Sequence, residues 1–314
     1  LYDLCKIEGS PNTYHLGYVI GPRINAGGRV GESSFGTKLL TSSEKEEALK
    51  IAMKLNDFNQ QRKNIEEKIL QDIEKKIHNF INDPVLFIDG NWHDGIIGIA
   101  ASRIKDKFNK PTIIASYQNE LAKASARSIA GFDIGLTILL AKEKGIIKNG
   151  GGHKMAGGFS YEKSKTNELR IFFNKEFLKK GIILSNSNKY LIDSKISATA
   201  INLDVYDEIE KLSPFGSANS EPKFLVENVR IIKSKVVGKK HISSILASKS
   251  NKSFKTIAFN SVKSPLEPYL SINNKKNFNI VGKLTCNEWQ GRKDIQFIIE
   301  DISVIKTTVV NNNG

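Results

Sequence analysis

A glycine-rich run with a histidine at its centre is the clearest candidate for chemistry in this sequence. Residues 149–160 read NGGGHKMAGGFS, with Gly151, Gly152 and His153 in the middle. Glycine tolerates positive φ and has no Cβ, so a loop of this composition lets backbone N–H groups approach an anion closely. A flexible hinge with an incidental histidine has the same composition. The run therefore indicates an anion-binding loop or a hinge.

A second run combines arginines with glycines. Residues 16–31 read LGYVIGPRINAGGRVG, which predicts a short apolar segment followed by a tight loop that holds Arg23, Asn25 and Arg29. Guanidinium groups pair with phosphate oxygens in a bidentate manner, and glycines leave the backbone open to assist. Taken alone, two arginines are better explained by ordinary loop salt bridges.

The composition narrows the partners and the compartment. Forty-seven lysines and arginines against 33 acidic residues give a formal net charge of +14. This excess favours nucleic acid or an anionic membrane surface as partner, although a lysine-rich proteome explains part of it. Cys5 and Cys286 lie far apart and form no CxxC, which argues against a disulfide framework and a cysteine zinc site. No membrane-span or signal pattern is present, so we expect a reduced, cytoplasmic location.

The elements that must position these residues follow from periodicity. One long amphipathic helix is predicted over residues 42–80, beginning at a capping box of Ser43 and Glu46. Strands are predicted at 85–88, 112–116 and 123–128, and helices within 91–108 and over 132–142 and 168–179. This alternation of strands and helices indicates an α/β domain, which the long helix connects to another domain.

The last third of the chain is predicted to be all-β. After a composition shift at 181–189, strands are predicted at 190–196, 224–237, 241–247, 254–260, 278–285 and 294–304, with one helix at 203–212. Short strands at this spacing favour a small closed barrel of the oligonucleotide-binding (OB) type. Most of its aromatic residues are expected in the core. Trp289, beside glycine and arginine in a turn, is the best candidate for stacking on a base.

Three stretches in this order resemble the bacterial RecJ family of single-strand DNA exonucleases: GPRINAGGR, WHDGIIGIAASR, and SARS followed by GGHKMAGG. The segment LSPFGSANSEPKF resembles the entrance to that family's OB domain. The resemblance implies an α/β DHH-associated domain plus an all-β OB barrel, joined by a long helix to a catalytic DHH domain. The domains expected are 1–40 (remnant of a preceding domain, with the GPRIN loop), 41–82 (connector helix), 83–182 (DHH-associated), 188–306 (OB) and 307–314 (tail).

The resemblance also implies a site for the 5′ phosphate of a single strand. The residues it implies are Arg23 or Arg29, Asn25, Ser125, Arg127, Gly151, Gly152 and His153. The family has a second alanine where this chain has Gly157, a change expected to cost little sterically. The implied function is the DNA-binding and end-positioning part of a 5′-to-3′ exonuclease in recombination and repair.

The metals of the family are the largest departure. The resemblance implies Mn²⁺ or Mg²⁺ held by aspartates and histidines of the DHH domain, and no Asp-His-His run occurs in this sequence. Two-metal hydrolysis needs clustered carboxylates. Since the chain also begins at Leu1, we expect a fragment that lacks its N-terminal catalytic domain and does not cut DNA by itself.

Two alternatives stay open. A DHH phosphodiesterase acting on short oligonucleotides would carry the same Gly-Gly-His run, although it would need no long basic groove. A catalytically silent single-strand DNA-binding protein would need no metal. The partners expected are single-stranded DNA, single-strand-binding protein and repair helicases, with no membrane and a monomeric chain.

Overall fold

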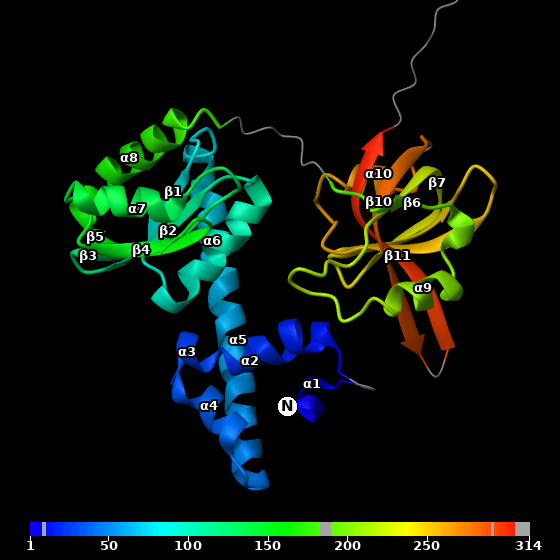
Figure 1. Ribbon diagram of the computed structural model, residues 1–314, viewed down its shortest axis with the longest axis horizontal. Coiled ribbons are helices and arrows are strands. Elements are labelled where there is room, and N and C mark those ends of the chain that lie inside the picture. Colours follow the sequence, from blue (N-terminus) through cyan, green and yellow to red (C-terminus); the bar gives the residue numbers. More distant parts are fainter. Residues whose placement is uncertain (8–10, 183–189, 275, 290–291, 305–314) are drawn as a thin grey trace, which may run out of the picture. The chain divides into compact units, whose positions relative to one another are not determined.

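The computed structural model describes residues 1–7, 11–182, 190–274, 276–289 and 292–304, and the chain divides into two compact units, Leu1–Ser187 and Asn188–Gly314 (Figure 1). Each unit has its own hydrophobic core. The finer division expected from the sequence stays a prediction. Among the described residues, no helix is both long and apolar enough to cross a membrane.

The longest helix of the first unit is α5 (Lys45–Lys76), and a 3₁₀ turn, η2 (Ile77–Asn79), continues it. Its buried stripe includes Leu55, Ile69 and Ile73. The long helix is confirmed, but the capping box is wrong. Glu44 is the N-cap, and no side chain caps it. Next to it, the Ser42 hydroxyl donates to Glu47 Oε2 at 2.8 Å.

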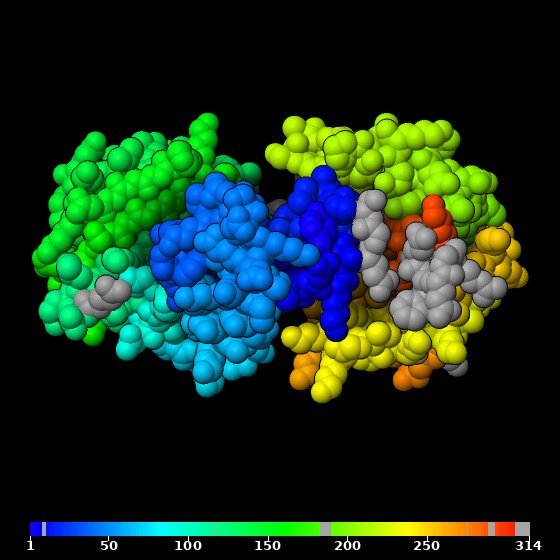
Figure 2. Space-filling view, turned by 90° about the horizontal axis from the view of Figure 1, so that it is seen from below, coloured from blue at the N-terminus to red at the C-terminus, as the bar shows by residue number. Residues whose placement is uncertain are grey.

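Short helices, and not the predicted loop, contain the GPRIN motif. The motif begins in α2 (Gly21–Ile24), and the neighbouring helices are α1 (Tyr2–Cys5), the π-helix η1 (His15–Ile20), α3 (Gly27–Val30) and α4 (Ser34–Thr41). Pro22 occupies the start of α2, where proline suits a helix. Gly27 lies against α5, since a Cβ there would be 3.3 Å from Leu55 Cδ2. Figure 2 shows α3, α4 and the first turns of α5 as one continuous blue surface.

A five-stranded sheet follows, with the order β1-β2-β3-β5-β4. Its strands are β1 (Leu86–Gly90), β2 (Thr112–Gln118), β3 (Leu121–Arg127), β4 (Asn149–His153) and β5 (Ala156–Glu162). Helix α6 (Asp94–Phe108) connects the parallel pair β1 and β2, and the other pairs are antiparallel. The α/β prediction is confirmed.

Helices cover the two faces of this sheet unequally. On one face, α7 (Ile134–Glu143) and α8 (Thr166–Lys179), which follows the 3₁₀ turn η3 (Lys163–Lys165), enclose an aromatic core that includes Phe87, Phe159 and Phe173. On the other face, α6 and α5 pack on β1 and β2 around Ile88 and Ile114. The other half of this second face, formed by β3, β5 and β4, lies next to α6.

The glycine-rich run is a β-hairpin, β4–β5, and not the predicted loop. The described glycines with positive φ are elsewhere, at 131, 145, 181 and 238. Part of the run serves packing: a Cβ on Gly157 would lie 2.4 Å from Ile138 Cδ1 of α7, and one on Gly152 would lie 2.4 Å from the Ala156 carbonyl oxygen. Glycine at 157 therefore accommodates Ile138, which makes this departure from the family pattern sterically significant.

Ion pairs to a buried carboxylate join α5 to α6. Glu66 is 5% exposed at its side chain, and its Oε2 lies 2.7 Å from Arg62 Nη1 on the same helix. The other carboxylate oxygen of Glu66 pairs with Arg103 of α6. Further along α5, Asp72 Oδ2 accepts a hydrogen bond from Trp92 Nε1 at 3.0 Å. These contacts fix the start and the middle of α6 on α5.

The second unit is a closed five-stranded barrel, as predicted for the OB fold. Its strands are β7 (Phe224–Val237), β8 (His241–Ala247), β9 (Ser253–Ala258), β10 (Phe278–Trp289) and β11 (Arg292–Val304). Pairing of β10 with β7 closes the barrel, and β9 pairs with β11 in parallel. The remaining elements are α9 (Leu203–Glu210), α10 (Glu267–Leu270), a 3₁₀ turn η4 (Ala198–Ala200) and β6.

Strand β6 (Ser194–Lys195) is much shorter than the predicted strand 190–196. It pairs with the start of β7 in parallel. Just before it, the side chain of Asp193 accepts a hydrogen bond from the Lys223 N–H at 2.8 Å. A carboxylate therefore contributes to this junction where a regular backbone ladder was expected.

Candidate nucleic-acid interface

The start of α6 is held firmly next to the sheet. His93 Nδ1 accepts a hydrogen bond from the Gly95 N–H at 3.1 Å, so this histidine caps the helix. The Trp92 N–H donates to Ser116 Oγ at 3.3 Å, and a Cβ on Gly90 would lie 2.6 Å from the Trp92 ring. The helix N-terminus, where the helix dipole favours anions, is thereby fixed beside β3.

Strand register places a polar surface beside α6. On β3, alanines at 122, 124 and 126 face the core, so Lys123, Ser125 and Arg127 face the opposite side. Each of these three has directly opposed partners on β5 and β4, and opposed residues share a face of the sheet. The three rows are Arg127–Ala156–His153, Ser125–Gly158–Gly151 and Lys123–Ser160–Asn149.

Two glycines of the middle row, Gly158 and Gly151, give this surface a floor of bare backbone. A Cβ on Gly151 would meet nothing within 4 Å, and one on Gly158 would meet only the Ala124 carbonyl oxygen at 3.4 Å. Any side chain at these positions would extend into the space above the sheet. Two glycines in one row therefore let a ligand approach the backbone closely.

Arg127 is held on this surface by three hydrogen bonds. Its Nε donates to Ser102 Oγ of α6 at 3.1 Å, and its Nη1 donates to Ser125 Oγ at 3.0 Å and to the Ala126 carbonyl at 2.8 Å. Burial lowers the pKa of Arg127, and the positive charge of Arg29 lowers it further. Arginine stays protonated in proteins, so two positive charges lie near each other here. Such a pair favours a bound anion.

Arg29 and Arg23 have different environments. Arg29 is exposed, its Nη1 donates to the Gly95 carbonyl at 3.3 Å, and it lies close enough to perturb Arg127. Arg23 is half-buried, with its Nε on Asn56 Oδ1 of α5 at 3.0 Å and its Nη1 on the Val19 carbonyl at 2.6 Å. The structure thus brings Arg29 into the cluster, whereas Arg23 holds its own helix on α5.

Of the remaining predicted residues, two lie on the polar surface and two do not. Gly151 lies on the floor, and His153 is exposed in the same row as Arg127, two strands away. Gly152 faces α7, because a Cβ on Gly135 of that helix would lie 2.9 Å from the Gly152 carbonyl carbon. Asn25 is exposed at the C-terminal cap of α2.

Three residues of this surface were missed from the sequence: Ser102, Lys123 and Ser160. Lys123 Nζ lies 3.1 Å from Asp94 Oδ2 at the start of α6. The alternation of polar residues with alanine in KASARS was a usable signal, since it marks one strand with a single polar face. The serine of α6 gave no signal of its own, because its role depends on where Arg127 points.

The described residues do not fit the metal site that the resemblance implies. Within that part of the chain, no group of three or more His, Cys, Asp or Glu side chains lies close enough to hold a metal ion. His93 caps α6 and Asp94 pairs with Lys123. The arginines and the serine of this surface can bind and orient an anion. We derive no hydrolytic step from it.

The barrel offers a separate basic surface on its outer side. Two rows cross β7, β8 and β9: Lys233–Ile245–Lys255 and Lys235–Ser243–Ile257. Phe259, next to these rows, is 53% exposed, and its ring lies edge-on to His241 with centroids 5.2 Å apart. Phe254 and Phe297 are buried, as expected for most of the aromatics, but Phe259 is not. The side chain of Trp289 lies outside the described residues, so its predicted stacking stays a prediction.

The two folds together define the class of protein. Residues 63–179 match the DHHA1 domain family, and residues 192–301 match the RecJ OB domain family. The chain belongs to the RecJ family. It is 31% identical to the single-stranded-DNA-specific exonuclease RecJ of Haemophilus influenzae, over 92% of this chain and 52% of that protein. The RecJ of Bacillus subtilis is 28% identical over 100% of this chain and 40% of its own length.

A solved structure shares the fold. The crystal structure of RecJ in complex with Mn²⁺ from Thermus thermophilus matches with a TM-score of 0.80 at 21% identity, covering 98% of this chain and 44% of that one. The chain thus spans about half the length of the curated relatives that it matches. RecJ structures from that organism are described with Mn²⁺ or with Mg²⁺.

Proposed function

We propose that this chain is the strand-binding and end-positioning part of a RecJ-type 5′-to-3′ single-stranded DNA exonuclease that acts in recombination and repair. The observation that carries the proposal is the convergence of Arg29, Ser125 and Arg127 above a glycine floor at the start of α6. Two guanidinium groups, a hydroxyl and exposed backbone suit a terminal phosphate, which offers several oxygens and a double charge.

The barrel supplies the second half of the proposal. Its outer rows contain three lysines, of which Lys255 pairs with Asp294, and Phe259 is an exposed aromatic ring next to them. Lysines suit the phosphodiester backbone, and an aromatic face suits an unpaired base. A continuous strand, and not a short oligonucleotide, would use both surfaces. Single-strand-binding protein and repair helicases are the partners that such an enzyme would meet, and the hydrolytic metals would be Mn²⁺ or Mg²⁺ held by a DHH domain.

The decisive experiment compares two strands that differ only at the 5′ end. Binding of this chain to a single strand with a 5′ phosphate and with a 5′ hydroxyl is measured by fluorescence anisotropy, alongside a nuclease assay with Mn²⁺. Phosphate-dependent binding without cleavage supports the proposal. Strand binding with no end preference would instead favour the alternative of a catalytically silent single-strand DNA-binding protein. Metal-dependent cleavage would overturn the view that this chain only positions the strand.

Strand binding is expected to weaken steeply as salt rises. Lysine and arginine contacts to phosphates release condensed counterions, so the logarithm of the affinity falls linearly with the logarithm of the salt concentration, by roughly 0.7 per contact on single strands. Titrations between low and physiological salt measure this slope. A flat affinity across salt would contradict a basic strand-binding surface.

Replacing Phe259 with alanine is expected to weaken binding of long strands without affecting the end preference. Stacking of one base on an aromatic ring contributes about 1–3 kcal/mol, which corresponds to roughly 5- to 150-fold in affinity. Phe259→Tyr, which keeps the ring, is the matched control. Equal binding by the alanine and tyrosine variants would exclude Phe259 as a stacking platform.

A further inference from the structure

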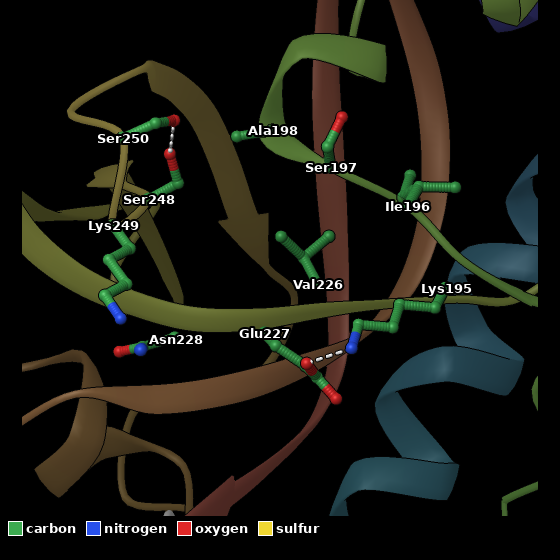
Figure 3. Close-up of a pocket in the computed structure, with 10 residues that line it drawn as sticks. All are labelled: Lys195, Ile196, Ser197, Ala198, Val226, Glu227, Asn228, Ser248, Lys249 and Ser250. Carbon is green, nitrogen blue, oxygen red and sulfur yellow. Dashed lines mark hydrogen bonds and ion pairs between the residues drawn. The ribbon is translucent and has the colours of Figure 1, made fainter.

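A pocket in the second unit lies outside both surfaces described above. It has a volume of about 590 Å³ and lies between the start of β7, the turn that follows β8, and η4 (Figure 3). Volumes of this size are typical of small-ligand sites. Since β7 and β8 are antiparallel, the pocket is at the end of these strands opposite the β7–β8 turn.

Hydrogen-bond donors gather on one side of this pocket. Lys249, in the turn after β8, is exposed and makes no ion pair with any residue the structure describes. In Figure 3 its ammonium group points toward the side chain of Asn228. Asn228 Oδ1 accepts a hydrogen bond from Asn277 Nδ2 at 2.7 Å, which orients the amide and leaves its nitrogen as a donor.

Hydroxyl groups extend this polar side. Ser248 Oγ and Ser250 Oγ lie 2.9 Å apart, and both residues line the pocket. Across from them, Ser197 stands at the entrance to η4. Val226 and Ala198 supply a small apolar surface between these groups. The lining therefore combines an apolar patch with donors of the kind that hold phosphate and sugar oxygens.

The net charge of the side chains that line the pocket indicates which kind of phosphate it would bind. Lys195 pairs with Glu227 at the rim, so these two charges offset each other. The remaining charged side chain is Lys249, which leaves one positive charge. An internal phosphodiester of a nucleic-acid strand carries one negative charge, whereas a terminal phosphate carries nearly two. The pocket matches the internal linkage better than the end.

We propose that this pocket binds one internal nucleotide of a single strand, with Lys249 and Asn228 on the phosphodiester and the Val226–Ala198 surface under the base or sugar. This site is separate from the end-binding cluster of Arg29, Ser125 and Arg127 and from the lysine rows on the outside of the barrel. The inference rests on the proposed function in one respect, namely that the barrel binds a strand.

The first test measures the salt slope of Lys249→Gln on a strand with a 5′ hydroxyl, which does not depend on the end cluster. Loss of one phosphate contact is expected to reduce the slope by about 0.7 and to weaken binding at low salt severalfold. Lys144→Gln is the matched control, because Lys144 is an exposed lysine at the end of α7, on the sheet face opposite the polar surface. If the parent chain binds the strand and both variants keep its slope, the pocket proposal fails alone. If the parent chain binds no strand, the proposed function fails.

The second test reads the pocket directly and does not require long strands. The thymidine dinucleotide dTpT, with one internal phosphodiester and no terminal phosphate, is titrated into the isotope-labelled full chain while backbone amide resonances are followed. Shifts confined to Asn228 and residues 248–251, and lost in Lys249→Gln, support the proposal. Absence of shifts there, equal shifts with inorganic phosphate, or a response only to an acidic peptide would each overturn it.

Discussion

Replacing Arg127 with alanine is expected to abolish the preference for a 5′-phosphorylated strand while binding through the barrel is retained. Arg127 is fixed by Ser102 and Ser125, and Arg29 lies near it, so the alanine variant leaves one positive charge where there were two. Hydrogen bonds to charged groups contribute about 1.5–3 kcal/mol, which corresponds to a loss of roughly 10- to 150-fold for the phosphorylated strand. Anisotropy titrations with both strands measure it.

Arg23→Ala is the matched control for this prediction. Its guanidinium contacts Asn56 and the Val19 carbonyl, so its loss should lower stability and leave the end preference intact. The reverse pattern, with the preference lost in Arg23→Ala and kept in Arg127→Ala, would place the phosphate at the other arginine. Equal losses for phosphorylated and hydroxyl strands in Arg127→Ala would reject the end cluster.

Two neighbouring glycines are expected to respond oppositely to the same change. In Gly152→Ala, the new Cβ would lie 2.4 Å from a backbone oxygen, and no rotamer change can relieve this overlap. Overpacking of this kind costs about 1–3 kcal/mol in the free energy of unfolding, with a fall in Tm of roughly 2–4 °C per kcal/mol for a unit of this size. Thermal unfolding monitored by circular dichroism measures the change.

Gly151→Ala carries the opposite expectation. Its Cβ meets nothing within 4 Å, so folding is retained, and removing glycine from the unfolded chain can even stabilise by up to about 1 kcal/mol. The methyl group would stand on the floor beside Gly158, in the same row as Ser125, and should weaken binding of the phosphorylated end. A stable Gly152→Ala variant, or unchanged end binding in Gly151→Ala, would show that the two roles are assigned wrongly.

Periodicity and turn residues were sufficient to predict most elements. Strands β7 and β8 have the predicted ends, and the long helix differs only at its termini, since buried faces repeat at fixed spacing. The glycine-rich run was the main failure. Glycines are rare in strands, and two of these are required because a Cβ on Gly150 or Gly157 would lie within 3 Å of the Ile138 side chain of α7. Ile138 precedes the run and belongs to a helix, so the run by itself does not reveal this requirement.

The candidate site was predictable only in part. Arg29, Ser125, Arg127 and Gly151 were all selected, but Arg23 was given the same weight as Arg29. The distinction depends on Gly95, whose missing Cβ would lie 2.1 Å from the Arg29 carbonyl oxygen and which therefore lets α3 approach α6. Nothing local to either arginine carries that information. Ser102 was missed for the same reason, because helix–sheet packing decides which side chain faces Arg127.

Helix α5 sets the spacing between the two arginines of the end cluster. Arg29 belongs to α3, which packs on the helix at Leu55, whereas Arg127 is held by α6, which is joined to the same helix at Glu66 and Asp72. Both arginines are thus positioned through contacts with the same helix. The opening between the guanidinium groups is therefore set by residues about 11 to 17 positions apart on α5, a separation of roughly 16–26 Å at 1.5 Å per residue. A substitution that bends α5 would therefore change the distance between Arg29 and Arg127 without altering either side chain.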